Sequence, residues 1–180
     1  MPAHLAAGQG GWYEMPPETV AGQLARGVAE GVFPGAVSLW GPPESEPQAV
    51  VCGLLGSSRN QSPVSLNTIY DLASVTKILA TTSLAVIVHG RGLLDLDRPI
   101  SDGPLRQLYS GVWPDFWRGI TPALMLSHQS GLKPWLPLYR LPAGPEPQSR
   151  LAAALETIIQ TAPLAKPGQR TIYSDLNFIL

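Results

Sequence analysis

Charge and cysteine are both scarce in this sequence. Charged residues make up 14% of the 180 residues, against about 25% in an average soluble domain. The formal net charge is −1, and no run of basic residues is present that could neutralise consecutive phosphates, which argues against nucleic-acid binding. The single cysteine, Cys52, excludes an internal disulfide, and its position in an apolar run predicts a buried, unreactive thiol.

Export signals, membrane spans and metal motifs are missing as well. Residues 1–13 contain no basic region followed by an apolar stretch, and no segment approaches the length of about 18 apolar residues that a transmembrane helix needs. These absences predict a soluble, cytoplasmic protein that binds no membrane. The histidines His4, His89 and His128 are far apart and no Cys/His cluster has metal-ligand spacing, so we expect no metal or other cofactor.

The residues that are abundant predict a globular protein rich in loops. Hydrophobic residues make up 44% of the chain, which is enough for a core. Gly 18 and Pro 19 together exceed the usual share of these residues without reaching the level of low-complexity sequences. The length fits one domain, or one domain and part of another.

The first third of the chain predicts a helix followed by two strands. Residues 1–15, with several glycines, are expected to form a flexible tail. Apolar residues at every fourth position from Val20 to Val28 predict an amphipathic helix. Two runs rich in β-branched and other apolar residues, 36–40 and 48–55, predict an antiparallel pair of strands. Residues 16–70 are therefore expected to be the first part of an α/β sheet domain.

Residues 71–180 predict a helical region. Its apolar patterns and end signals indicate helices at 79–90, 121–128 and 151–162, and another helix starting at 176. We expect this region to bury its own apolar faces locally. The two strands before it would by themselves make only a marginal sheet with unpaired edges.

A Ser-x-x-Lys pattern, which chance would produce roughly once in a chain of this length, occurs twice. Ser130 and Lys133 are separated by the helix breaker Gly131, whereas Ser74 and Lys77 open a long apolar helix. At the start of a helix this spacing brings the amine within reach of the hydroxyl, and the helix dipole favours developing negative charge. The alternative is that Ser74 only caps the helix and Lys77 is solvated.

The Ser74-Lys77 motif is one of several short sequence blocks that follow one another along the chain in the order of a known superfamily. They are Pro34-Gly35-Ala36-Val37, Asp71-Leu72-Ala73-Ser74-Val75-Thr76-Lys77, Leu94-Asp95-Leu96-Asp97-Arg98-Pro99, Leu126-Ser127-His128-Gln129-Ser130-Gly131-Leu132, Pro167-Gly168 and Tyr173-Ser174-Asp175. With these blocks the sequence resembles the serine β-lactamase and penicillin-binding-protein superfamily, in particular the branch of class C β-lactamases, family VIII esterases and D-aminopeptidase-like hydrolases. The resemblance covers nearly the whole chain.

The resemblance implies a role for each residue of the catalytic motifs. Ser74 would be the acylated nucleophile, Lys77 its activating partner, and Tyr173 the proton shuttle to the leaving group. Asp175 stands where the family usually has Asn, and a carboxylate there would raise the pKa of Lys77 and keep it cationic, which favours Tyr173 as the base. A rival alignment with the Ser-Asp-Asn motif of class A enzymes would use Ser174, Asp175 and Asn177, but Leu176 intervenes.

Other polar and aromatic residues are expected to have structural roles. The resemblance places the segment of His128 in the helical region and outside the catalytic trio. Trp113, Trp117 and Trp135 could line the mouth of a substrate site, but tryptophans among prolines and glycines are more often anchors of loops.

The third motif of the superfamily, Lys-Thr-Gly or His-x-Gly, is not in the sequence. The resemblance therefore implies an α+β fold of the β-lactamase/transpeptidase type that is incomplete, with the C-terminal strands and helix missing. We expect a serine hydrolase for a small-molecule ester, amide or lactam, inactive unless a complementary C-terminal segment is supplied, or else a non-catalytic remnant or binding module. Self-association through the edge of the sheet is also expected.

Overall fold

The computed structural model describes residues 19–56, 61–141 and 147–180 and contains two compact units, Met1–Asp71 and Leu72–Leu180. Each unit is described by itself. The tail predicted at residues 1–15 lies outside the described residues. None of the described helices is long and apolar enough to cross a membrane.

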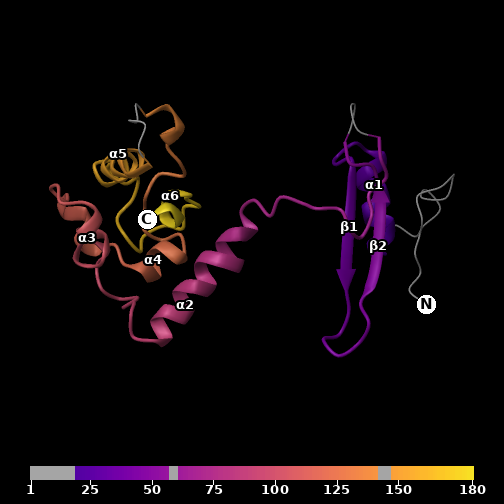
Figure 1. Cartoon of the computed structure of the whole chain (residues 1–180), viewed down its shortest axis with the longest axis horizontal. Helices are drawn as coiled ribbons and strands as arrows, with labels where there is room; N and C mark the ends of the chain where they lie inside the picture. The colour runs from indigo at the N-terminus through magenta and orange to yellow at the C-terminus, as the bar shows by residue number, and fades with distance from the viewer. Residues whose placement is uncertain (1–18, 57–60, 142–146) are drawn as a thin grey trace. The chain divides into compact units, whose positions relative to one another are not determined.

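In the first unit a helix and two strands form in the predicted order (Figure 1). Helix α1, Val20–Ala29, begins where the Thr19 side chain accepts a hydrogen bond from the Gly22 N–H at 3.0 Å. Strands β1, Gly35–Trp40, and β2, Gln48–Gly53, pair antiparallel from Gly35 opposite Gly53 to Trp40 opposite Gln48. The predicted strands at 36–40 and 48–55 are thus present with slightly different bounds.

The core of the first unit is small. Its buried apolar residues are Ala21, Ala25, Val50, Cys52 and Val64. Cys52 is 2% exposed, so the predicted burial is confirmed, and burial raises the pKa of its thiol, as expected for an unreactive cysteine.

The second unit is helical. Its longest elements are α2, Ser83–Gly90, which continues the π-helical turn η2, Lys77–Thr82, and α5, Pro147–Ile159. Shorter elements are η3 (Ile100–Asp102), α3 (Leu105–Leu108), η4 (Asp115–Gly119), α4 (Pro122–Leu126), η5 (Leu138–Arg140) and α6 (Leu176–Ile179). The helix predicted at 121–128 ends at Leu126, because His128 adopts a positive φ of 58° that stops the helix.

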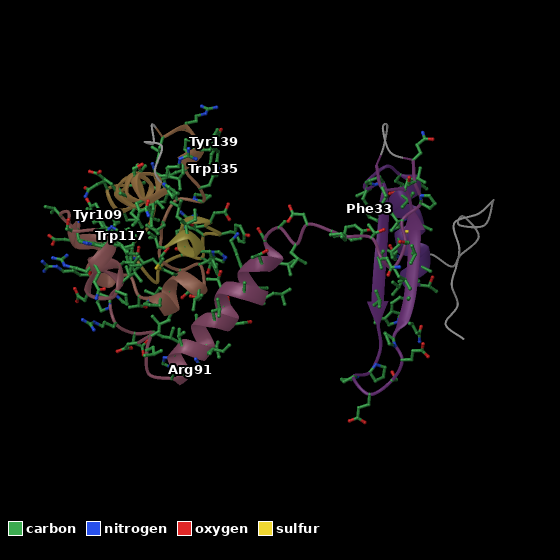
Figure 2. All side chains as sticks on the ribbon, viewed as in Figure 1. Phe33, Arg91, Tyr109, Trp117, Trp135 and Tyr139 are labelled. Atoms are coloured by element: carbon green, nitrogen blue, oxygen red, sulfur yellow. The ribbon has the colours of Figure 1, made fainter. Side chains whose placement is uncertain are left out.

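One hydrophobic cluster holds this unit together. Its buried members are Leu105, Trp117, Ile120, Met125, Leu132, Leu155, Ile158, Ile159 and Leu176. Trp117 is fully buried and its indole N–H donates to the Ile159 carbonyl at 2.8 Å, while Trp113 packs edge-on against it. Trp135 is 58% exposed and lies, with Tyr139, at the periphery of the unit (Figure 2). Of the three tryptophans, Trp117 is therefore a core residue, which the sequence pattern did not indicate.

The helix formed by η2 and α2 differs from the rest of this unit. It contains no buried residue, and its apolar side chains Ile78, Leu79, Leu84, Val86 and Ile87 are exposed. The expectation that the helical region buries its own apolar faces is wrong for this helix, because the cluster packs around α3 to α6 instead.

Candidate active site

Ser74 lies immediately before the first helical residue, Val75. The chain turns sharply here: Ala73 has a positive φ of 43°, and the Val75 and Thr76 N–H groups already donate to the carbonyls of residues 72 and 73. Lys77 follows one turn later, and its ammonium donates to Ser74 Oγ at 3.2 Å. The spacing of three residues therefore brings the amine and the hydroxyl together at the start of the helix, where Ser74 is exposed.

The ammonium of Lys77 has a second partner from a distant part of the chain. Asp175 Oδ1 lies 2.7 Å from Lys77 Nζ, and this hydrogen bond raises the pKa of Lys77 above its ordinary value of 10.5. The Lys77 side chain is only 16% exposed, so the pair is partly shielded from water, although Asp175 is 49% exposed. Lys77 is consequently cationic at neutral pH.

Tyr173 also lies next to the Lys77 ammonium. The ammonium lies 5.3 Å from the centre of the phenol ring, and hydrogen bonding with Ser74 and Lys77 lowers the pKa of Tyr173 below its ordinary value of 10.0. The nearby Asp175 carboxylate opposes this shift by charge repulsion. The structure thus brings the four residues singled out in the sequence, Ser74, Lys77, Tyr173 and Asp175, into one cluster.

The tyrosine segment is held by a loop at residues 128–134. Backbone N–H groups of residues 172 and 175 donate to the carbonyls of His128 and Pro134 at 2.8 and 2.7 Å, and the buried Ser174 hydroxyl donates to the Lys133 carbonyl at 2.6 Å. The loop can follow this path because Gly131 has a φ of 80°, and a Cβ there would overlap the backbone of Ala165. The loop therefore fixes the backbone on both sides of Tyr173.

The buried residues Ser130 and Asn177 and the half-buried His128 form a chain of polar contacts next to the tyrosine. The Ser130 hydroxyl donates to Asn177 Oδ1 at 2.5 Å, and Asn177 Nδ2 lies 3.2 Å from His128 Nδ1. The Ser174 backbone N–H also reaches His128 Nδ1, at 3.1 Å. Sequence reasoning did not single out Asn177 as a partner of Ser130. The rival alignment through residues 174–177 was the one signal that pointed to it.

The second Ser-x-x-Lys motif does not form a comparable pair. Ser130 is fully buried and donates to Asn177, and Lys133 takes part in this network through its main-chain carbonyl, which accepts the Ser174 hydroxyl. A buried hydroxyl that already donates cannot reach a substrate carbonyl.

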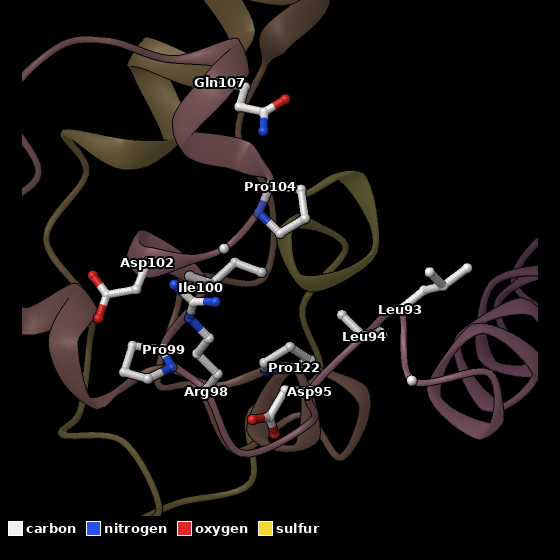
Figure 3. Close-up of a pocket in the computed structure, with 12 residues that line it drawn as sticks. Leu93, Leu94, Asp95, Arg98, Pro99, Ile100, Asp102, Pro104, Gln107 and Pro122 are labelled. Atoms are coloured by element: carbon white, nitrogen blue, oxygen red, sulfur yellow. The ribbon is translucent and has the colours of Figure 1, made fainter.

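The second unit also contains a cavity that is separate from the Ser74 cluster. Its volume is about 380 Å³, and its lining includes Asp95, Arg98, Asp102 and Gln107 (Figure 3). None of the residues of the Ser74 cluster lines it. Among the described residues there is no group of three or more His, Cys, Asp or Glu side chains that could hold a metal ion.

Comparisons with known proteins found a matching family model and a similar solved structure. The family model described as Beta-lactamase matches residues 20–180. A solved structure, "Crystal structure of putative beta-lactamase from Bacteroides dorei DSM 17855", is 21% identical with a TM-score of 0.59 and covers 91% of this chain. No curated protein matches the sequence.

The structural similarity confirms the predicted fold. This chain has an α+β fold of the β-lactamase type and spans 44% of the length of the similar structure. The match of the family model extends over nearly the whole sequence, including all four residues of the cluster. The chain belongs to the beta-lactamase family.

Proposed function

We propose that this protein is a serine hydrolase that attacks an ester, amide or lactam and forms an acyl-enzyme on Ser74. The observation that supports this best is the position of the Lys77 ammonium, 3.2 Å from Ser74 Oγ and 2.7 Å from Asp175. A cation at this place stabilises the phenolate of Tyr173 and orients the serine hydroxyl.

In the proposed mechanism Tyr173 is the base and Lys77 stays charged. The Tyr173 phenolate removes the proton from Ser74 Oγ while this oxygen forms a bond with the carbonyl carbon of the substrate. The phenol then returns the proton to the leaving oxygen or nitrogen as the acyl bond breaks. Water then attacks the acyl carbon while Tyr173 accepts a proton from it, and the phenol returns this proton to Ser74 Oγ as the bond between Ser74 and the acyl group breaks. Asp175 serves this cycle by keeping Lys77 protonated, since its hydrogen bond raises the pKa of Lys77.

The negative oxygen that develops on the substrate needs hydrogen-bond donors. The backbone N–H of Ser74, at the start of a helix, would be one donor. The family resemblance assigns the second to a strand carrying Lys-Thr-Gly or His-x-Gly, and the 180-residue sequence contains neither motif. Because loss of one donor costs roughly a hundred- to a thousandfold in rate, we propose that this chain alone turns over slowly and that a complementary segment with such a strand completes the site.

The experiment that tests the proposal is labelling with a fluorescent penicillin and with a fluorophosphonate, followed by mass spectrometry of the peptides. We expect one adduct, on Ser74. Adduct formation on Ser130, or a folded protein that neither probe labels even at long times, would contradict the proposal. The second result would favour the alternative function, a non-catalytic binding module with the same fold.

A further inference from the structure

His128 lies directly against the base of the proposed mechanism. Its ring centre is 4.5 Å from that of Tyr173, with an angle of 36° between the ring planes, and 5.2 Å from that of Phe178. The backbone of His128 has a positive φ of 58°, and its carbonyl accepts the N–H of Ile172 at 2.8 Å. A non-glycine residue in this conformation is uncommon and is maintained by the surrounding contacts.

The hydrogen bonds of the ring fix its protonation state. His128 Nδ1 faces the Ser174 backbone N–H, which can only donate, so Nδ1 must be the unprotonated nitrogen. Asn177 Nδ2 faces the same atom, and the orientation of this amide is set by Ser130, whose hydroxyl donates to Asn177 Oδ1. Two donors therefore point at one acceptor, and the proton of the neutral ring is on Nε2.

We propose that His128 is a positioning residue for Tyr173, and that a proton on Nδ1 loosens the tyrosine segment at Ser174. The proposal rests on the proposed function, in which Tyr173 is the base. A protonated Nδ1 would present an N–H to two other N–H donors, so the bond from the Ser174 backbone N–H would be replaced by repulsion. The segment that carries Tyr173 would then lose one of its bonds to the loop, next to the phenol, and would be held there by the Ser174 hydroxyl bond to the Lys133 carbonyl.

The charges around His128 favour the neutral ring. Burial lowers the pKa of His128 below its ordinary value of 6.5, and the Lys77 ammonium lowers it further, while the Asp175 carboxylate acts in the opposite direction. Tyr173 and Phe178 contact the ring, and Tyr173 adds a negative charge only as phenolate. Because the folded-state pKa is lowered, the contribution of His128 to stability is complete above its ordinary value and is lost as the pH falls toward the folded-state value.

The matched variants for the test are His128→Asn and His128→Ala. Asn tolerates positive φ, and its Oδ1 can accept the Ser174 N–H, but it does not titrate. Ala removes the acceptor as well. Both variants lose the ring, so the difference between them reports the hydrogen bond together with the greater ease with which Asn adopts the positive φ of residue 128. His89→Asn is the control, because His89 is exposed on α2 and its ring bonds the Leu94 carbonyl, outside the Ser74 cluster.

Two measurements on the full chain separate this inference from the proposed function. The first is the pKa of the Tyr173 phenol, from carbon NMR of protein labelled at the tyrosine ζ position, with Tyr173→Phe to assign the signal. This measurement of the Tyr173 pKa does not depend on any activity of the protein. The second is the rate of Ser74 labelling by the fluorophosphonate as a function of pH.

We expect the Tyr173 pKa to rise toward 10.0 in His128→Ala and to stay close to the wild-type value in His128→Asn. Labelling should fall on the order of a hundredfold in His128→Ala, the typical cost of a misplaced group, and recover in His128→Asn. In the wild type and in His89→Asn, acidification should slow labelling first by the uptake of one proton and then more steeply by a second. His128→Asn should show only the first dependence.

An unchanged Tyr173 pKa in His128→Ala, or a second proton dependence that persists in His128→Asn, would overturn the inference. If His128→Ala does not fold, the pH dependence of His128→Asn decides. If the Tyr173 pKa responds as expected but Ser74 is never labelled, His128 positions the tyrosine and the hydrolase mechanism is wrong.

Discussion

The two Ser-x-x-Lys segments of this chain share a spacing and differ in almost everything else. Ser74 is exposed at the start of a helix, and Lys77 Nζ lies 3.2 Å from its hydroxyl. Ser130 is fully buried in a loop, where its hydroxyl donates to Asn177. The first segment has an accessible hydroxyl beside a cation, and the second has a hydroxyl used to hold the chain together.

The difference shows that spacing alone does not make a nucleophile. In a helix the side chains three residues apart meet on one face. Of the two segments, residues 74–77 have this geometry and residues 130–133 do not. At residues 130–133 the positive φ of Gly131 turns the backbone, and the carbonyl of Lys133, instead of its amine, takes part in the site by accepting the Ser174 hydroxyl. The second motif thus supports the first through the segment that carries Tyr173.

The largest effect should come from the two serines. Ser74→Ala removes the only accessible hydroxyl of the pair, so we expect complete loss of labelling by a fluorophosphonate without loss of folding. Ser130→Ala should leave an adduct on Ser74 that mass spectrometry detects. If Ser74→Ala is labelled as fast as the wild type, the distinction between the two segments fails.

The second largest effect on the labelling rate should come from the two lysines. Lys77→Met removes the cation beside Ser74 and Tyr173, and we expect labelling to slow by about a hundredfold to ten-thousandfold, the range for loss of proton-transfer assistance. Lys133→Met keeps the carbonyl that accepts the Ser174 hydroxyl, so its labelling rate should match that of the wild type. Equal losses in both variants, measured under identical conditions, would contradict the assignment of Lys77.

Local patterns predicted the elements of the fold well. The four-residue period from Val20 to Val28 and the β-prone runs gave α1, β1 and β2 close to their observed bounds. These elements depend on neighbours in the sequence, which periodicity can detect. The helix predicted to reach residue 128 ends at Leu126, because the conformation of His128 is set by contacts with residues 172–177 that lie far away in the chain.

The contacts of the site could be predicted only in part. Nothing in the local sequence pairs Ser130 with Asn177, since the two residues are 47 positions apart. The grouping of Ser74, Lys77 and Tyr173 was expected from the family resemblance, because local spacing explains only the first pair. The full burial of Trp117 also depends on a distant partner, the Ile159 carbonyl.

A smaller effect should distinguish the serines by stability. Ser130→Ala leaves Asn177 Oδ1 buried without its donor, and a buried unsatisfied polar group costs about 1–3 kcal/mol of unfolding free energy. Ser74→Ala, at an exposed position, should stay within about 0.5 kcal/mol of the wild type. Urea unfolding followed by circular dichroism measures both values. Equal stability of the two variants would mean that the bond between Ser130 and Asn177 contributes nothing.

The smallest effect concerns Asp175, whose carboxylate pairs with Lys77 of the first segment. In Asp175→Asn the hydrogen bond that raises the pKa of Lys77 loses its charge, so the Lys77 pKa should fall. The Tyr173 pKa should fall as well, because the Asp175 carboxylate opposes ionisation of the phenol. Both limbs of the pH dependence of Ser74 labelling, the rise with Tyr173 ionisation and the decline with loss of the Lys77 charge, therefore shift to lower pH.

The stability of Asp175→Asn provides a second readout of the same pair. A raised Lys77 pKa stabilises the folded chain at all pH values below the ordinary value of 10.5 and ceases to do so as the pH rises through the folded-state value. Since Asp175 is 49% exposed, the loss in the variant should be about 1 kcal/mol or less at neutral pH. It should vanish in strongly alkaline solution. A labelling profile whose alkaline limb moves to higher pH in Asp175→Asn would show that Asp175 does not maintain the charge of Lys77.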